Sequence, residues 1–388
     1  MTSSILAKLD GLELPAAADF HVHLRDGAMM ETVVPLIRVG GVNTVYVMPN
    51  LVPPLTSASD AMAYKNRLQK LDPKVNYLMT LYLHESITPA VVKGAKAQGI
   101  VGIKVYPAGV TTNSSSGVSS YEPFYPVFRA MEQCGMVLNL HGECPSDHAK
   151  NITILNAEST FLPTLKGLHE MFPKVRPRNF KLGPRPMVLW GKLTGLNPIQ
   201  LKIVLEHCTT KEAVQAVNDC GPNVVGTITA HHLFLTVDDW ADDPFCYCKP
   251  VAKWPTDREA LIKAALAGTG KFFLGSDSAP HDVKAKKGGN GKTAAGVFTQ
   301  PYLLPLVFDA FEQAIARNVI TEDEVTVDIL KGFLGGYGRR FYGPSSEGDN
   351  ETVIISKGTE VIQESFTGQG VEVVPFRRGQ STWSVKFK

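Results

Sequence analysis

No stretch of this sequence approaches the roughly 20 consecutive apolar residues that a membrane-spanning helix requires. The N-terminal segment MTSSILAKLDGLELP also lacks the basic residues and long apolar run that mark a secretory signal. Neither sign of charge dominates, because the formal net charge is +2 and no long block of like charge occurs. Composition therefore offers no support for nucleic-acid binding. We expect a soluble, cytoplasmic protein with no membrane partner and no nucleic-acid partner.

Cysteine is sparse and shows no disulfide spacing. Six cysteines are scattered over 388 residues, which predicts reduced thiols in a cytosolic protein. Cys246 and Cys248 could form half of a metal site, but no second pair completes it. The glycine-rich segment 288–291 lacks the pattern and the strand–helix context of a phosphate loop, so we reject nucleotide binding there.

Short apolar runs alternate along the chain with segments that are compatible with helices. The length of 388 residues allows either one large α/β barrel or two ordinary domains. Runs such as 42–48 and 100–106 are separated by helix-compatible segments such as 58–71, 121–134 and 257–268. This alternation predicts a parallel sheet that is covered by helices.

Several apolar runs end abruptly in a residue that can do chemistry. Because the carboxyl ends of parallel strands meet at one mouth of a (β/α)₈ barrel, residues far apart in the sequence can converge there. The pattern therefore predicts an active face on such a barrel. The strand-end residues are His21 and His23, Lys104, His141, His207 and Asp277.

These residue types suit a metal centre. His21 and His23 are two residues apart on a predicted strand, so both imidazoles face the same side and can reach one zinc ion. Alone this pair is weak evidence, and His141 and His207 could each be a hydrogen-bonded core histidine. Asp277 could simply cap a turn. All of these groups at strand ends together are harder to explain as incidental.

Lys104 needs a chemical change before it can join such a centre. An ammonium group has no lone pair for a metal. Reaction with carbon dioxide would replace the amine with an anionic carbamate, whose two oxygens could bridge two cations. The residues alone do not show this modification.

The motifs resemble those of the dihydroorotase family, of the monofunctional type within the metal-dependent amidohydrolase superfamily. The resemblance extends from about Asp19 to the C-terminus, and its motifs occur in the family's order. It implies a (β/α)₈ TIM barrel and the reversible hydrolysis of dihydroorotate to N-carbamoyl-L-aspartate in pyrimidine biosynthesis. The motifs are HVHLRDG, VYVMPN, IKVYPAGVTTNSSSGV, LNLHGE, VLEHCTT and GSDSAPH.

The resemblance also implies a ligand set and a catalytic residue. His21, His23 and Asp277 would hold the more buried of two zinc ions, and His141 and His207 would hold the second. Lys104, carboxylated on its side-chain nitrogen, would bridge the two ions. Asp277 would accept a proton from the attacking nucleophile and pass it to the leaving ring nitrogen.

Further residues match the family's substrate contacts. Arg25, Asn50 and His281 would bind the substrate carboxylate; their alternatives are a surface ion pair, a turn and a loop role respectively. The segment TTNSSSG resembles a mobile loop that closes over substrate through Thr111 and Thr112. Ala295 would contact the pyrimidine ring through its backbone.

The domain organisation follows from the same comparison. Residues 1–350 are expected to form the hydrolase barrel, and residues 351–388 a short C-terminal extension packed on it. The tail alternates apolar and polar residues between turn residues, which predicts short strands. The sequence leaves the oligomeric state open, with a homodimer as one option.

The sequence has two alternative interpretations, another cyclic amidase and a noncatalytic scaffold. A hydantoinase or dihydropyrimidinase would share the metal set, but Arg25, Asn50 and His281 favour a substrate with a carboxylate. A noncatalytic scaffold related to these enzymes would be expected to have lost ligands, and here the full set is present.

Residues 175–200, VRPRNFKLGPRPMVLWGKLTGLNPIQ, interrupt the family pattern. Removing them joins FPK to LKIVLEHCTT, which resembles an uninterrupted family sequence. The segment is either a surface insertion in a barrel loop or a retained intron. We favour the intron, because a valine codon begins with GT, a glutamine codon can end in AG, and the length preserves the reading frame.

The intron interpretation predicts that the mature transcript lacks the codons for residues 175–200. Sequencing the spliced message tests this directly. A mature message that still encodes the segment would exclude the intron and leave the insertion.

Overall fold

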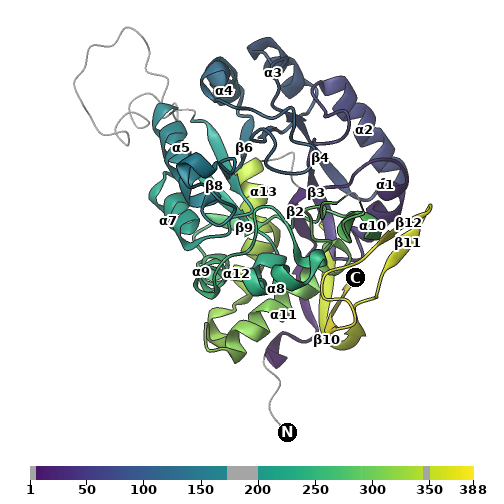
Figure 1. The fold of residues 1–388 in the computed structure, drawn as a ribbon. Helices are drawn as coiled ribbons and strands as arrows, with labels where there is room; N and C mark the ends of the chain where they lie inside the picture. Colours follow the sequence, from purple (N-terminus) through teal and green to yellow (C-terminus); the bar gives the residue numbers. More distant parts are fainter. Residues whose placement is uncertain (1–5, 173–199, 290, 344–349) are drawn as a thin grey trace.

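The computed structural model describes residues 6–172, 200–289, 291–343 and 350–388. Its centre is a sheet of eight parallel strands whose spatial order is their order in the chain, β2 to β9 (Figure 1). An isolated parallel bridge between Val22 and Ser278 connects the two edges of this sheet. The strands are β2 (Ala17–Val22), β3 (Val42–Val47), β4 (Asn76–Tyr82), β5 (Gly102–Val105), β6 (Val137–His141), β7 (Lys202–Glu206), β8 (Val224–Ile228) and β9 (Phe272–Leu274).

Helices follow the strands and surround the sheet, so the predicted (β/α)₈ barrel is confirmed. Local sequence sets where they begin; for example, the Ser57 side chain accepts a hydrogen bond from the Asp60 amide and caps α2. The helices are α1 (Gly27–Val33), α2 (Ala58–Leu71), α3 (Pro89–Ala97), α4 (Tyr125–Cys134), α5 (Ala157–Met171), α7 (Lys211–Asp219), α8 (Val237–Asp242), α9 (Pro255–Leu266), α10 (Val283–Lys286), α11 (Leu303–Ala316), α12 (Val327–Lys331) and α13 (Tyr337–Tyr342).

An aromatic cluster fills one end of the barrel interior. Tyr342 of α13 stacks on Phe20 at a ring-centroid distance of 5.0 Å and lies 4.7 Å from the ring of Tyr46. Phe273 meets Phe20 edge-on at 5.2 Å. These rings are buried, so this end of the barrel is an apolar floor beneath the strand ends.

The C-terminal strands form a small sheet of their own against the barrel. Strand β10 (Thr352–Val361) pairs with β13 (Ser381–Phe387) and with β1 (Leu12–Pro15) near the N-terminus. A hairpin of β11 (Phe366–Gly368) and β12 (Val371–Val373) lies beside α1 and α10 (Figure 1). Trp383 of β13 packs on Phe308 of α11 at 5.2 Å, so the extension contacts a barrel helix.

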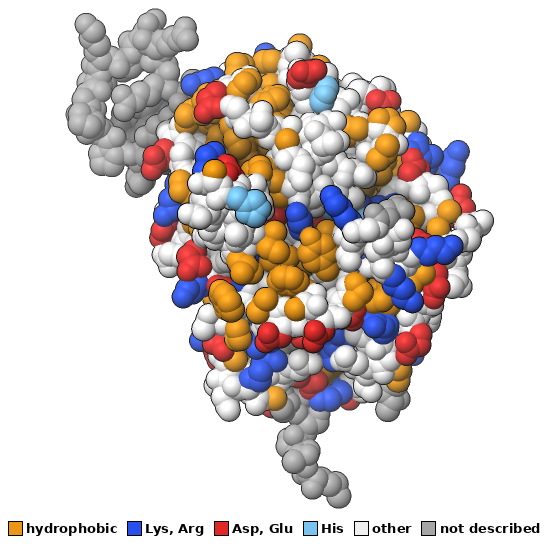
Figure 2. All heavy atoms as spheres, in the orientation of Figure 1, with side chains coloured by type: hydrophobic (Ala, Val, Ile, Leu, Met, Phe, Trp, Pro, Cys, Tyr) orange, Lys and Arg blue, Asp and Glu red, His pale blue; other side chains and the backbone are white. Residues whose placement is uncertain are grey.

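The surface in Figure 2 mixes hydrophobic, basic and acidic side chains, with both signs of charge around its edge. In the described part of the chain, no helix has the length and apolar character needed to cross a membrane. Of the predicted insertion 175–200, only Gln200 belongs to the described residues, and it precedes β7.

Candidate active site

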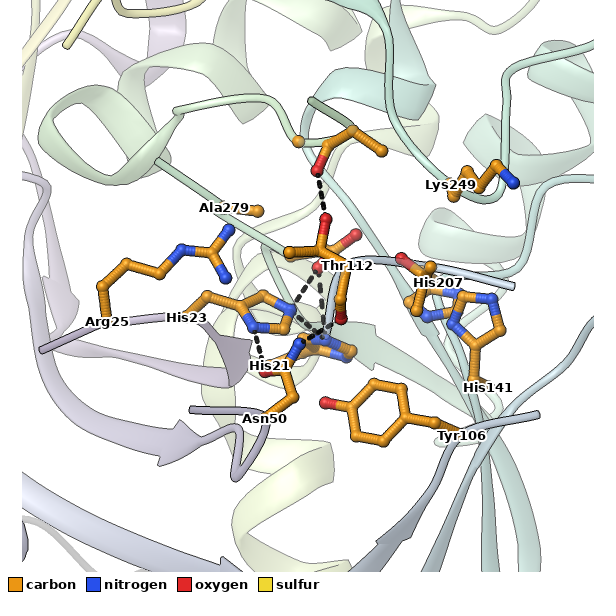
Figure 3. A pocket seen from close by; sticks show the side chains of 14 residues that line it. His21, His23, Arg25, Asn50, Tyr106, Thr112, His141, His207, Lys249 and Ala279 are labelled. Atoms are coloured by element: carbon orange, nitrogen blue, oxygen red, sulfur yellow. Dashed lines mark hydrogen bonds and ion pairs between the residues drawn. The ribbon is translucent and has the colours of Figure 1, made fainter. Parts of the chain in front are cut away.

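Most of the predicted site residues line one pocket at the carboxyl ends of the strands (Figure 3), and Lys104 and His281 are the two that do not. In that view Arg25 lies on one side of the pocket and His141 and His207 on the other, with His21 and His23 between them. The lining residues are His21, His23, Arg25, Asn50, Tyr106, Thr111, Thr112, His141, His207, Lys249, Asp277, Ala279, Ala295 and Gly296.

His21, His23 and Asp277 already have the spacing of metal ligands. The Nε2 atoms of the two histidines are 3.3 Å apart, and Asp277 Oδ1 lies 3.2 Å from His21 Nε2 and 3.0 Å from His23 Nε2. Two atoms that each lie about 2.0 to 2.1 Å from a tetrahedral zinc ion are about 3.3 Å apart. The donor atoms therefore fit a single cation.

Hydrogen bonds hold two of the imidazoles in a defined tautomer. His23 Nδ1 lies 2.8 Å from Asn50 Oδ1, which can only accept, so the proton is on Nδ1 and Nε2 carries the lone pair. His141 Nε2 lies 2.8 Å from a carboxylate oxygen of Glu143 and therefore donates to it. In His141 the lone pair is consequently on Nδ1.

Lys104 is completely buried and does not line the pocket. Its Nζ donates to a carboxylate oxygen of Glu206, which is equally buried. The same Glu206 oxygen lies 3.0 Å from His21 Nδ1. A second group of close donor atoms, His21, Glu206 and His207, is thereby formed next to the first.

Burial holds the bases of the site in their neutral forms. Desolvation lowers the pKa of His23 to about 3, and it lowers the pKa values of His21, His141 and His207. Desolvation also lowers the pKa of Lys104 well below its ordinary value. Neutral imidazole and neutral amine are the forms that can bind metal ions or react with an electrophile.

Asp277 is held as an anion. Burial by itself would raise its pKa, but the positive charge and the N–H groups that His21 and His23 present when they are protonated lower the pKa well below its usual value. An anion beside two neutral imidazoles is the charge arrangement that a divalent cation would complete.

Three residues of the pocket have strained backbones. Arg25, His207 and Asp277 have φ values of 59°, 43° and 45°, in the left-handed region that L-residues rarely adopt. Each follows a barrel strand directly or within three residues. Such strain is often retained where it aims a functional side chain.

Arg25 is a half-buried cation that lines the pocket. Desolvation lowers its pKa to about 10, so it stays charged at neutral pH. Its Nη2 lies 3.1 Å from His281 Nε2. That His281 Nε2 atom also lies 2.9 Å from the Ala295 carbonyl oxygen. A guanidinium only donates and a carbonyl only accepts, so either position of the His281 proton satisfies one contact and not the other.

The loop that carries Thr111 and Thr112 folds over the pocket. The Asn50 side chain donates to the Thr112 carbonyl at 3.0 Å, and the Thr112 hydroxyl donates to the Ala295 carbonyl at 3.3 Å. Lys249 donates to the Val110 carbonyl at 2.7 Å. The loop thus occupies polar groups of the pocket that a ligand could otherwise use.

Comparison with known proteins identifies the family. A probable dihydroorotase of Schizosaccharomyces pombe is 46% identical over 365 residues, which cover 94% of this chain and 96% of that protein. The chain belongs to the dihydroorotase family. No protein-family model matches the chain. Dihydroorotases are metal-dependent hydrolases of a cyclic amide bond, and the histidine and carboxylate clusters of this pocket suit a metal.

Solved structures agree with this membership. A dihydroorotase of Saccharomyces cerevisiae, in complex with 5-fluoroorotic acid, is 40% identical with a TM-score of 0.84, covering 98% of this chain and 99% of that one. A D-hydantoinase is 15% identical with a TM-score of 0.69, covering 97% of this chain and 82% of that one, and it shares the fold alone.

The structure adds residues to this dihydroorotase pocket that the sequence motifs did not indicate. Tyr106 and Lys249 line it, and Glu206 lies directly beneath it. The sequence could have indicated Tyr106, because it lies two residues after Lys104 and side chains two apart along a strand face the same side. Glu206 lies beside His141 in the register of β6 and β7, but its side-chain contacts are with Lys104, His21 and Asn139 on strands far away in the sequence.

A third cluster, His231, His232 and Cys248, also has donor atoms within reach of one ion. His232 uses both ring nitrogens, at 2.8 Å from Thr229 Oγ1 and 3.1 Å from the Pro250 carbonyl. The Cys248 thiol donates to the same carbonyl at 3.2 Å. These hydrogen bonds give His232 and Cys248 a structural role that needs no metal ion.

His231 should make stability depend on pH. Desolvation lowers its pKa from the ordinary value of 6.5 to about 4, so between these values the unfolded chain binds more protons than the folded one. Unfolding free energy should therefore fall as the pH is lowered through this window. His231→Gln should remove about 3 kcal/mol of that loss, at 1.36 kcal/mol per pKa unit.

Urea unfolding of the metal-free protein at pH 7 and at pH 4.5 measures the difference. His148→Gln, at an exposed position, is the matched control and should keep the wild-type dependence. An unaltered dependence in His231→Gln would contradict the assignment of a buried neutral imidazole.

Proposed function

We propose that this chain catalyses the reversible hydrolysis of dihydroorotate to N-carbamoyl-L-aspartate with two zinc ions bridged by carboxylated Lys104. The observation that carries the proposal is one pocket that joins groups able to bind a metal to a half-buried, charged Arg25. Free thiols at all six cysteines support a cytoplasmic location for the reaction, in pyrimidine biosynthesis.

The donor set supports a pair of ions rather than one. His21, His23 and Asp277 would hold the first ion, and their spacing matches the bond lengths of zinc. His141 and His207 would hold the second, and their rings lie 4.7 Å apart on the opposite side of the pocket. When bound, two zinc ions lower the pKa of water and polarise a carbonyl oxygen.

Lys104 is suited to carry the bridging carbamate. Its amine is buried, and burial favours the neutral form. A neutral amine can attack carbon dioxide, forming a C–N bond and releasing one proton. The product is an anion, which would offset part of the cationic charge of two zinc ions in a buried site.

Asp277 is positioned to move the proton of the reaction. Hydrolysis forms a bond from water oxygen to the ring carbonyl carbon and breaks the bond from that carbon to the ring nitrogen. Asp277 would accept the proton of the attacking water and deliver it to the leaving nitrogen. Its lowered pKa keeps it ready to accept, and the reverse reaction uses the same transfers in the opposite order.

The substrate carboxylate would complete the group at Arg25. The guanidinium and the His281 imidazole compete for partners, and a carboxylate can accept from both. Asn50 could add its amide once the loop releases it. This anion site favours dihydroorotate over hydantoin, which has no carboxylate in that position.

The loop residues would exchange internal contacts for contacts with substrate. Thr112 now donates to Ala295, whose backbone is the expected contact of the pyrimidine ring. Thr111 lines the same pocket. A bound substrate would replace these hydrogen bonds with its own, so closing the loop over it need not cost unpaired polar groups.

The purified protein should hydrolyse dihydroorotate and contain two zinc ions per chain, while turnover of hydantoin should be far slower. Dihydroorotate consumption, hydantoin consumption and zinc content are measured on one sample. Faster turnover of hydantoin would reverse the substrate assignment, and a protein with neither zinc nor activity would support a noncatalytic scaffold.

Asp277→Asn should lower kcat by about 10²- to 10⁴-fold, the usual contribution of a positioned acid–base group. Zinc content should fall much less, because the amide oxygen can still bind a cation. Asp219→Asn, at an exposed carboxylate, is the control and should retain activity. Near-normal turnover by Asp277→Asn would remove the proposed proton-transfer role.

A further inference from the structure

Glu206 touches two of the proposed metal ligands without facing the pocket. One of its carboxylate oxygens accepts from Lys104 Nζ and lies 3.0 Å from His21 Nδ1. Its other oxygen accepts from the Asn139 side-chain amide at 2.8 Å. Glu206 is 0% exposed, so water does not compete for these contacts. One carboxylate thereby connects a ligand on β2 with a ligand on β5.

The contact with His21 is electrostatic rather than a well-aligned hydrogen bond. The ring nitrogen is close to the oxygen, but His21 Nδ1 has no hydrogen-bond partner of good geometry among the described residues. A proton on Nδ1 is still favoured beside the anion. That leaves the Nε2 lone pair on the side of Asp277 and His23, where the first metal would bind.

Glu206 is itself held in place from below. The Asn139 amide that donates to it also lies 2.7 Å from Tyr342 Oη, and the Asn139 carbonyl oxygen accepts from Tyr46 Oη at 2.6 Å. A side chain at Gly102 would block this arrangement, because its Cβ would lie 2.1 Å from Tyr46 Oη. The network therefore depends on a small residue at that point of β5.

The network lies between the aromatic floor and the metal ligands. Val137, Asn139 and His141 alternate along β6, so one strand contributes a residue to the floor, to the network and to the ligands in turn. Tyr46 and Tyr342 belong to the floor and reach upward with their hydroxyl groups. The orientation of Glu206 is thus tied to the packed core.

We propose that Glu206 is a positioning residue that orients Lys104 and His21 for the metal pair. The proposal rests on the function proposed above. A lysine carbamate keeps one hydrogen on its nitrogen, and this N–H can continue to donate to Glu206. In the carboxylated protein, Glu206 as the acceptor would restrict rotation of the carbamate and so orient it toward the proposed metal site. Before carboxylation, the same carboxylate compensates any positive charge on Lys104.

Glu206→Gln tests this role with little change in shape. The substituted amide keeps an oxygen for Asn139 but presents N–H groups to Lys104 and His21, which are themselves donors. We expect zinc affinity to fall about 10- to 100-fold, the usual effect of changing a residue that orients a metal ligand. The visible absorption of the cobalt-substituted protein should change, as should the ¹³C carbamate signal after labelling with ¹³CO₂.

Two variants separate positioning from general stability. Asp257→Asn alters another buried carboxylate, whose hydrogen bonds are with the backbone amides of Lys211 and Trp254 rather than with a proposed metal ligand. It should keep wild-type zinc affinity even if it unfolds at a lower temperature. Glu206→Asp retains an acceptor and should recover part of the affinity that Glu206→Gln loses.

The outcomes are distinct. Wild-type zinc affinity and an unchanged cobalt spectrum in Glu206→Gln would overturn the inference alone, as would an equal loss of affinity in Asp257→Asn. A wild-type protein that binds no zinc would overturn the proposed metal centre and this inference with it. If Glu206→Gln does not fold, Tyr46→Phe decides: a several-fold loss of zinc affinity supports the inference, and no loss overturns it.

Discussion

A lysine side chain buried among the strands of a barrel is costly unless something compensates its polarity. Lys104 is in this position, and Glu206 is its partner. This pair constrains the residues that contact it. The Glu206 carboxylate needs Asn139 for its second oxygen, and Asn139 needs hydroxyl groups that only the rings of the barrel floor provide. The chemistry at the strand ends therefore depends on packing several ångströms below it.

The same logic applies to the histidines of the pocket. Burial keeps them neutral, which suits metal binding, but a neutral imidazole has two tautomers. Asn50 selects one tautomer in His23, and Glu143 selects one in His141. Each of these partners comes from a strand end or the loop after it. The pocket thus contains both the histidines and the groups that orient them.

The substrate side of the pocket is arranged differently. Arg25 is charged and half-buried, and in the described part of the chain its side chain contacts Pro280 and His281 rather than forming an ion pair with a carboxylate. Asn50 and Ala295 are meanwhile bonded to Thr112 of the covering loop. The proposed substrate would have to replace these hydrogen bonds to the loop, whereas the histidines proposed as metal ligands could keep their hydrogen bonds to Asn50 and Glu143.

Much of this molecule could be predicted from its sequence. Alternating apolar runs and helical segments predicted the barrel, because strand and helix periodicities are local properties. His21, Lys104, His141, His207 and Asp277 were recognisable because each follows an apolar run, and parallel strands bring such positions to one mouth of the barrel.

The hydrogen-bond partners of these residues, in contrast, depended on the tertiary structure. Glu206 stands next to His207 in the sequence, yet its role follows from contacts with β2, β5 and β6, and no local pattern encodes contacts between strands that are separated by tens to hundreds of residues. Only the closed barrel brings these groups within hydrogen-bonding distance.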